Sequence, residues 1–311
     1  MSAQNDTKIR QLYSDIDEEL NKVPFGCIWP RFHKFDYALY TKELICLPSK
    51  VIPANLVQNK KKLFDFEGKR YILWNAKHSK APIQDVASDL VHKMFHVFQY
   101  TRNEMRIPDE KKGLNYPDNA KNYYLKLMEG YFLSRAIMTK DTEEKRACFF
   151  DFLLKRKQRM KQYGEDLAFE YYIETVEGSA EYCGLKALSY MSEERYWKKL
   201  KECCYHMVHD STLLFNTGQY AAYAGALLLL LAECLQIPVS KEITGNKLTI
   251  FEECCKYITE EEKMELLSDE CVASISSEET IHKLYEEYIQ SQSGSNQKEK
   301  KDDELLRICR I

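Results

Sequence analysis

The chain has 311 residues, 30% of them charged, with a formal net charge of −3 and a pI of about 6.2. This balance provides no basic surface for nucleic acid or an acidic membrane, so we expect neither partner. The 11 cysteines form no CxxC pair, and no apolar segment opens the chain, which favours a reducing, cytoplasmic environment. The longest apolar run, Ala221–Ala232, is too short to span a bilayer and suits a buried helix.

The predicted elements form a small sheet followed by a long helical region. Residues 6–22 have the period of an amphipathic helix. The aromatic and branched stretches 35–47 and 64–75 predict strands, and the second stretch divides into a hairpin at Glu67-Gly68. Beyond Arg106 the pattern is helical, with helices expected at about 117–139, 141–162, 163–191, 193–209, 211–236, 246–268 and 277–290.

The order of these elements predicts an α+β, mostly helical fold. We expect a single domain over residues 1–290, with a β-rich subregion at 23–80 and a helical subregion at 81–290. Residues 291–311 begin with a polar, low-complexity stretch, which predicts a mobile C-terminal tail.

A histidine pair lies within the helix expected between Pro82 and Arg106. The apolar residues of this helix fall on one stripe, and His92 and His96 lie roughly opposite that stripe. Two imidazoles one turn apart can bind one metal ion. The same spacing also suits two surface histidines on a polar helix face, so a third ligand is needed to favour the metal.

A row of carboxylates on a later helix supplies candidates for that third ligand. Glu170, Glu174, Glu177 and Glu181 project to one side of the helix predicted at 163–191. Like charges at this spacing repel by about 0.2–0.5 kcal/mol per pair, and by more when they are shielded from water. The row therefore requires cations opposite it.

Two sources of positive charge are open at this point. One is a neighbouring helix, whose basic residues include Arg156 and Lys157. The other is a metal ion held jointly with His92 and His96.

The HxxxH pair, followed on a later helix by Glu-Gly-x-Ala-x-Tyr at Glu177–Tyr182, resembles the gluzincin zinc metallopeptidases, the clan of thermolysin and aminopeptidase N. The resemblance implies a zinc site whose ligands are His92, His96 and Glu177. It covers these two helices and their order after a small sheet. The 81 residues that separate His96 from Glu177 require an inserted helical pair.

The resemblance also implies supporting residues around the zinc ligands. Glu181 stands one turn after the ligand glutamate, where a carboxylate often orients a ligand histidine, and Glu174 lies on its other side. Members of the family also use a tyrosine to stabilise the oxyanion of the reaction. Tyr220 and Tyr223 are the candidates for this role, and core packing is the alternative interpretation of both.

Lys93 departs from the family pattern, because it replaces the glutamate that serves as general base in HExxH. An ammonium group cannot accept a proton. Three outcomes are open: zinc binds while Lys93 turns to Glu174 or Glu181; Lys93 replaces the metal and neutralises Glu177 or Glu174; or a neutral Lys93 is itself the base.

We therefore expect a metallopeptidase-like protein that takes zinc as its cofactor and a peptide or protein as its ligand, with weak peptide hydrolysis or none. One alternative is an active zinc metallohydrolase that uses Glu174 as the base. The other is a metal-free helical interaction module.

Overall fold

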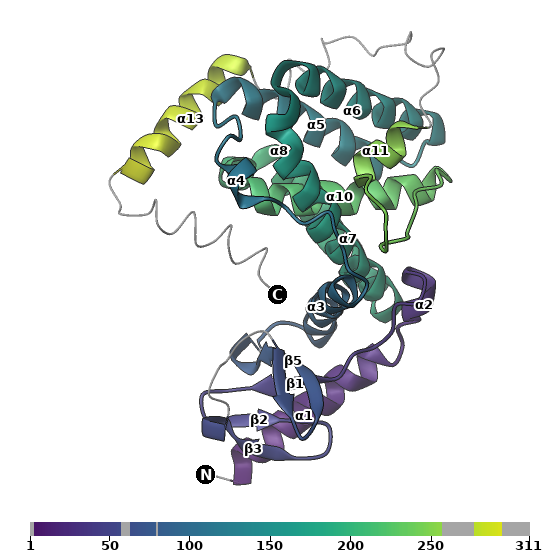
Figure 1. Cartoon of the computed structure of the whole chain (residues 1–311), viewed down its shortest axis with the longest axis vertical. Coiled ribbons are helices and arrows are strands. Elements are labelled where there is room, and N and C mark those ends of the chain that lie inside the picture. The colour runs from purple at the N-terminus through teal and green to yellow at the C-terminus, as the bar shows by residue number, and fades with distance from the viewer. Residues whose placement is uncertain (1–2, 57–62, 79, 257–276, 294–311) are drawn as a thin grey trace. The chain divides into compact units, whose positions relative to one another are not determined.

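The computed structural model describes residues 3–56, 63–78, 80–256 and 277–293. Within these residues the protein is mostly helical and has one five-stranded sheet near the N-terminus (Figure 1). The predicted α+β, mostly helical fold class is therefore confirmed. The end of the helix predicted at 246–268 and most of the predicted tail lie outside the described residues.

Contacts divide the chain into two compact units, with a boundary inside the predicted helical subregion. In the described part of the chain, the first unit consists of residues up to Asn103 and of Cys183–Lys199, and the second consists of Glu104–Tyr182 and the residues from Leu200 onward. Two helices, α7 (Ala168–Met191) and α8 (Glu193–His209), contribute residues to both units.

The sheet belongs to the first unit and has the strand order β3-β2-β1-β5-β4. Its strands are β1 (Tyr37–Tyr40), β2 (Leu44–Cys46), β3 (Val51–Pro53), β4 (Leu63–Phe66) and β5 (Lys69–Asn75). β1 and β5 pair in parallel, and the other neighbours are antiparallel. In the predicted hairpin, Phe66 pairs with Lys69, and Glu67 and Gly68 between them have φ angles of 48° and 75°. Two positive φ angles are typical of a type I′ turn.

The helices of the first unit surround α3 (Ile83–Thr101), which carries the histidine pair. The unit also contains α1 (Ala3–Leu20), α2 (Phe25–Ile28), the short 3₁₀ turns at Ala54–Leu56 and Ala76–His78, and the first residues of α8 (Glu193–His209). The predicted apolar stripe of α3 is largely buried, with Ala87, Leu90 and Met94 all 0% exposed. Phe95 packs edge-to-face on Trp29 at a centroid distance of 4.9 Å.

The histidine helix is shorter than the sequence predicts. It ends at Thr101 instead of Arg106, because Asn103 has a φ angle of 52°. A left-handed residue at this place is a common way for a helix to end, and asparagine adopts that conformation more readily than most residues.

The second unit is helical in its described part. Its longer helices are α5 (Ala120–Met138), α6 (Thr142–Tyr163), α7, most of α8, α10 (Thr217–Cys234) and α13 (Glu278–Ser293). Its shorter ones are α4 (Glu110–Gly113), α9 (Ser211–Phe215), α11 (Ile250–Cys255) and the 3₁₀ turn Gly164–Leu167. The helix predicted at 211–236 is two helices, α9 and α10, separated at Asn216. The Asn216 side chain caps α10 by accepting a hydrogen bond from the backbone N–H of Gln219.

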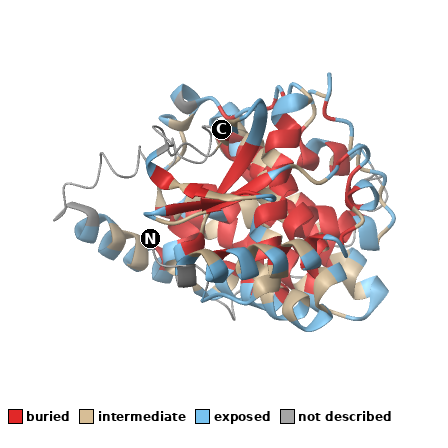
Figure 2. Ribbon diagram, turned by 90° about the horizontal axis from the view of Figure 1, so that it is seen from below, coloured by how far each residue is buried: buried red, intermediate tan, exposed pale blue. Residues whose placement is uncertain are grey.

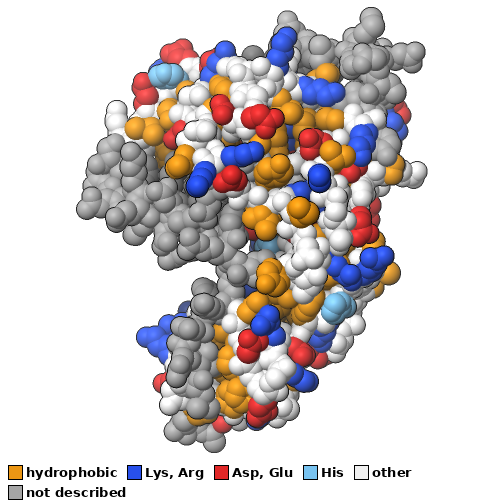
Figure 3. Space-filling view, viewed as in Figure 1, with side chains coloured by type: hydrophobic (Ala, Val, Ile, Leu, Met, Phe, Trp, Pro, Cys, Tyr) orange, Lys and Arg blue, Asp and Glu red, His pale blue; other side chains and the backbone are white. Residues whose placement is uncertain are grey.

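The buried residues lie in the strands and on the inward faces of the helices (Figure 2). The predicted buried helix is α10, where Leu227, Leu228 and Leu231 are 0% exposed. Among the helices that the structure describes, none combines the length and apolarity needed to cross a membrane. Basic and acidic side chains are interspersed on the face seen in Figure 3.

Candidate metal site

His92 and His96 lie side by side on α3, and both are half-buried. Their rings meet edge-to-face with a centroid distance of 4.7 Å, and their Nε2 atoms lie 3.0 Å apart. The spacing of four residues produces this arrangement, because it places both side chains on one face of the helix. The apolar stripe, on the other side of α3, fixes that face by packing into the core.

The C-terminal part of α7 packs closely on α3 within the first unit. The Ser88 hydroxyl donates a hydrogen bond of 2.9 Å to the carbonyl oxygen of Gly184. Gly184 allows this approach, because a Cβ there would lie 3.2 Å from the Ser88 carbonyl oxygen and 3.6 Å from the His92 Cβ. The contact at Gly184 therefore fixes α7 directly beside the first histidine.

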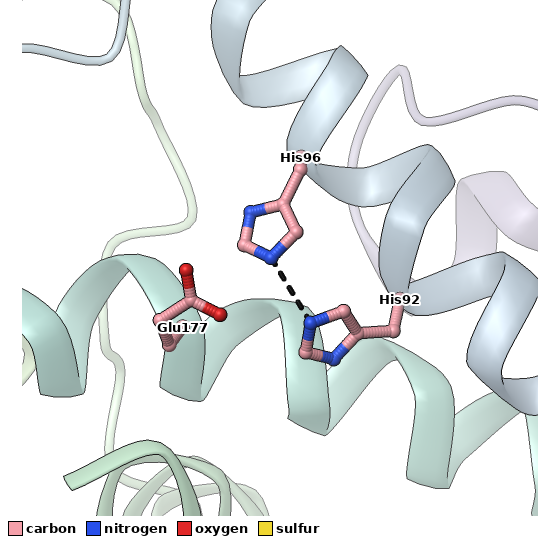
Figure 4. Close-up of side chains that lie close together, drawn as sticks. All are labelled: His92, His96 and Glu177. Carbon is pink, nitrogen blue, oxygen red and sulfur yellow. Dashed lines mark hydrogen bonds between the residues drawn. The ribbon is translucent and has the colours of Figure 1, made fainter. Parts of the chain in front are cut away.

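Glu177 lies two turns before Gly184 on the same face of α7. Single ligand atoms of His92, His96 and Glu177 all lie within 4.8 Å of one another. Figure 4 shows the Glu177 carboxylate directed toward the two rings. His92, His96 and Glu177 thus form a possible metal-binding triad.

The types of donor in this triad are ones that a zinc ion uses. Tetrahedral Zn²⁺ with bonds of ~2.0–2.1 Å separates its ligand atoms by roughly 3.3 Å. The 3.0 Å between the two Nε2 atoms is close to this value. Two imidazoles and one carboxylate also leave a fourth position open, as zinc sites that act on substrates do.

A buried amide contacts the second histidine. Gln99 is 2% exposed, and its Oε1 lies 2.9 Å from His96 Nδ1. An amide oxygen only accepts hydrogen bonds, so Nδ1 of His96 carries the proton. His96 Nε2 then carries no proton and lies 3.0 Å from His92 Nε2. The sequence alone predicted no role for Gln99.

The row of glutamates on α7 divides between two kinds of partner. Arg156 of α6 donates hydrogen bonds to Glu174 and, at 2.9 Å, to Glu129. Arg159 donates to Glu170 at 3.0 Å. The interpretation that a neighbouring helix neutralises the row is thus confirmed for Glu170 and Glu174, whereas Glu177 faces the histidines.

These charges form a fully buried cluster in the second unit, with three basic and three acidic members that are each at most 1% exposed: Lys126, Arg156, Arg159, Glu129, Glu170 and Glu174. Burial lowers the pKa of Lys126 to about 8. Burial also raises the pKa of Glu174 to about 7, although Arg156 opposes that change. At Glu170 the opposing charges prevail, and Arg159 and Lys126 hold its pKa below the usual range despite burial.

Glu174 and Tyr220, which were predicted as an alternative general base and as an oxyanion group, are both buried. Glu174 is fully buried and accepts from Arg156, so water has no access to it as a general base. The Tyr220 hydroxyl donates to the carbonyl oxygen of Lys126 at 2.9 Å, and the Lys126 ammonium lies 4.7 Å from the Tyr220 ring centroid. Tyr220 therefore packs in the buried cluster.

The remaining predicted residues are half-buried. Lys93 follows His92 on α3, and Glu181 follows Glu177 by one turn on α7. The Tyr223 hydroxyl accepts a hydrogen bond from Gln219 at 3.4 Å. Their roles as base position, supporting carboxylate and oxyanion group stay predictions.

Two glycines bring α10 against α7 next to the metal-ligand candidate Glu177. A Cβ on Gly178 would lie 2.6 Å from the Gly225 Cα, and a Cβ on Gly225 would lie 2.1 Å from the carbonyl oxygen of Glu174. Real Cβ atoms do not approach other atoms so closely, so only glycine fits both positions. The backbone of α7 therefore meets α10 at Glu174 and at Gly178, on either side of Glu177.

Comparisons with protein-family models, with curated proteins and with solved structures found no match. The function is therefore argued from the geometry and chemistry of the site.

Proposed function

We propose that His92, His96 and Glu177 bind a divalent metal ion, with zinc preferred, in a metallopeptidase-like protein. The protein would bind a peptide or protein ligand and hydrolyse it weakly or not at all. The observation that carries the proposal is the convergence of three ligand atoms within 4.8 Å, from two stretches of chain 81 residues apart.

The types of donor support zinc as the ion. Imidazole and carboxylate together suit Zn²⁺, whereas an oxygen-only site would suit Mg²⁺ or Ca²⁺. A zinc ion held at this position would polarise a carbonyl group of a bound ligand. The tautomer of His96 is already the required one, because its Nε2 lone pair faces the other ligand atoms.

Lys93 accounts for the expected lack of hydrolysis. In HExxH sites the glutamate after the first histidine accepts the proton of the attacking water. A lysine ammonium at this position donates protons and does not accept them. Glu174 does not replace the missing base, because it is buried and paired with Arg156.

Zinc titration of the purified full-length protein tests the metal site. After removal of metal with a chelator, we expect one Zn²⁺ per chain to bind. Substitution of a direct ligand, as in His92→Ala, His96→Ala or Glu177→Gln, should weaken binding by more than the ~10–100-fold typical of residues that only support a ligand.

Two exposed residues provide matched controls for this titration. His33→Ala removes an exposed histidine, and Glu165→Gln removes an exposed carboxylate. Both variants should bind zinc as the wild type does. A wild-type protein that binds no zinc, or ligand variants that bind it as tightly as the wild type, would contradict the proposed site.

Restoring the missing base tests the metallopeptidase-like assignment. A positioned general base contributes ~10²–10⁴-fold to rate, so Lys93→Glu should create zinc-dependent cleavage of a peptide library that the wild type leaves intact. Lys93→Gln removes the charge without adding a base and should stay inactive. If the wild type itself cleaves peptides and a chelator stops it, the protein is an active metallohydrolase and the expected inactivity is wrong.

A further inference from the structure

We infer that Gln99 is a positioning residue for the metal site and sets the tautomer and orientation of His96. This inference deepens the proposed function and rests on it for the role of the metal. The contact on which it depends can be measured in protein from which metal has been removed.

The contact between Gln99 and His96 is short and enclosed. Gln99 Oε1 lies 2.9 Å from His96 Nδ1, and the glutamine is 2% exposed although its side chain is polar. A buried amide without a hydrogen-bond partner costs ~1–3 kcal/mol, so its partner is part of the reason it is tolerated.

The chemistry of the pair determines where the histidine proton lies. An amide oxygen accepts a hydrogen bond and never donates one, so it selects the imidazole tautomer with its proton on Nδ1. Nε2 of the same ring then has a free lone pair, which is the form that binds a metal. In the structure this Nε2 lies 3.0 Å from His92 Nε2, within the triad of ligand atoms.

The spacing along α3 makes Gln99 suited to this task. It follows His96 by three residues, so both side chains lie on neighbouring parts of the same helix face. The backbone of a helix is rigid, so the acceptor is held in place before any metal arrives. A neutral amide orients the ring without adding charge, whereas a carboxylate at this position would also increase the basicity of the imidazole.

The first test measures the tautomer directly. In metal-free protein labelled with ¹⁵N-histidine, long-range ¹H–¹⁵N spectra should show His96 with its proton on Nδ1, its signals being assigned with His96→Ala. Gln99→Leu removes the acceptor and should move a substantial fraction of His96 to the Nε2-protonated form. An unchanged tautomer in Gln99→Leu would overturn the inference. Should Gln99→Leu fail to fold, Gln99→Met, of closer length, takes its place.

The second test measures zinc affinity in the same variants. Gln99→Leu should raise the dissociation constant for Zn²⁺ by ~10–100-fold, as loss of a group that orients a ligand does. Gln99→Glu keeps an acceptor and should bind zinc as tightly as the wild type or more tightly. If Gln99→Glu is weakened as much as Gln99→Leu, the acceptor is not what matters and the inference fails.

Gln84 provides a matched control for both the tautomer measurement and the zinc titration. Gln84 also lies on α3, but its amide donates to Glu19 at 3.0 Å, so Gln84→Leu should change neither the His96 tautomer nor zinc affinity. If the wild type binds no zinc, the proposed function fails. The tautomer measurement in metal-free protein then still decides whether Gln99 orients His96.

Discussion

Glu174 differs from Glu170, the other glutamate of the buried cluster on α7, in the direction in which its pKa is shifted. It is fully buried, and burial raises its pKa to about 7, while Arg156 only partly offsets the effect. Its Oε1 has no hydrogen-bond partner among the described residues, so that half of the carboxylate is poorly compensated. Burial thus dominates at Glu174, whereas at Glu170 the contact with Arg159 lowers the pKa.

The raised pKa of Glu174 predicts a pH dependence of stability. In the unfolded chain the carboxyl has a pKa near 4.5, so from there to pH 7 the folded state holds a proton that the unfolded state releases. The stabilising contribution is complete below pH 4.5 and is lost as pH rises toward 7. The total loss is up to about 3 kcal/mol.

Urea unfolding at pH values from 4.5 to 7.5 measures this effect. We expect the wild type to lose free energy of unfolding across this range relative to Glu174→Gln, which has no proton to release. Contributions from groups that both proteins share cancel in the difference. Glu165→Gln, at an exposed position, should follow the wild type. Parallel curves for the wild type and Glu174→Gln would show that the Glu174 pKa is not raised.

At the scale of elements, the crossing of α7 and α10 supports the carboxylate ligand. Gly178 and Gly225 let the two backbones touch on either side of the position at which Glu177 leaves α7. A side chain at the crossing has no rotamer that avoids the clash, because the nearest atoms belong to the backbone. The two helices must therefore separate or shift if either glycine is replaced.

Gly225→Ala tests this role of the crossing. The added Cβ would lie 2.1 Å from the carbonyl oxygen of Glu174, so we expect a loss of ~1–3 kcal/mol in the free energy of unfolding, as for other overpacked sites. Because α7 must move next to Glu177, zinc affinity should fall as well. Gly26→Ala is the control, since its Cβ would meet no atom closer than 3.9 Å. Unchanged stability and zinc affinity in Gly225→Ala would contradict this account.

For the whole molecule, the sequence predicted most elements because their periodicity is strong. The hairpin at Glu67-Gly68 has a turn signal between two aromatic stretches, and it formed with the expected two-residue loop. β3 was missed, because three residues that include Pro53 carry no periodicity. The break at Asn216 was missed too, because the residues on both sides are helical and only a cap separates them.

The candidate site could be predicted only in part. Helical spacing places His92 and His96 on one face, but it was the resemblance to gluzincins that selected Glu177 from its row. Spacing could not assign a partner to each glutamate, since this depends on where α6 places Arg156 and Arg159. The role inferred for Gln99 also escaped prediction, because a glutamine on a polar helix face is ordinarily exposed.

The central claim is that two histidines and one glutamate share a metal ion. The most direct measurement is a zinc-edge anomalous difference map from crystals of the full-length protein grown with zinc. We expect one peak at ~2.0–2.2 Å from an imidazole nitrogen of His92, from His96 Nε2 and from a Glu177 carboxylate oxygen. A map without density among these three side chains, with Lys93 bonded to Glu177 in its place, would contradict the account.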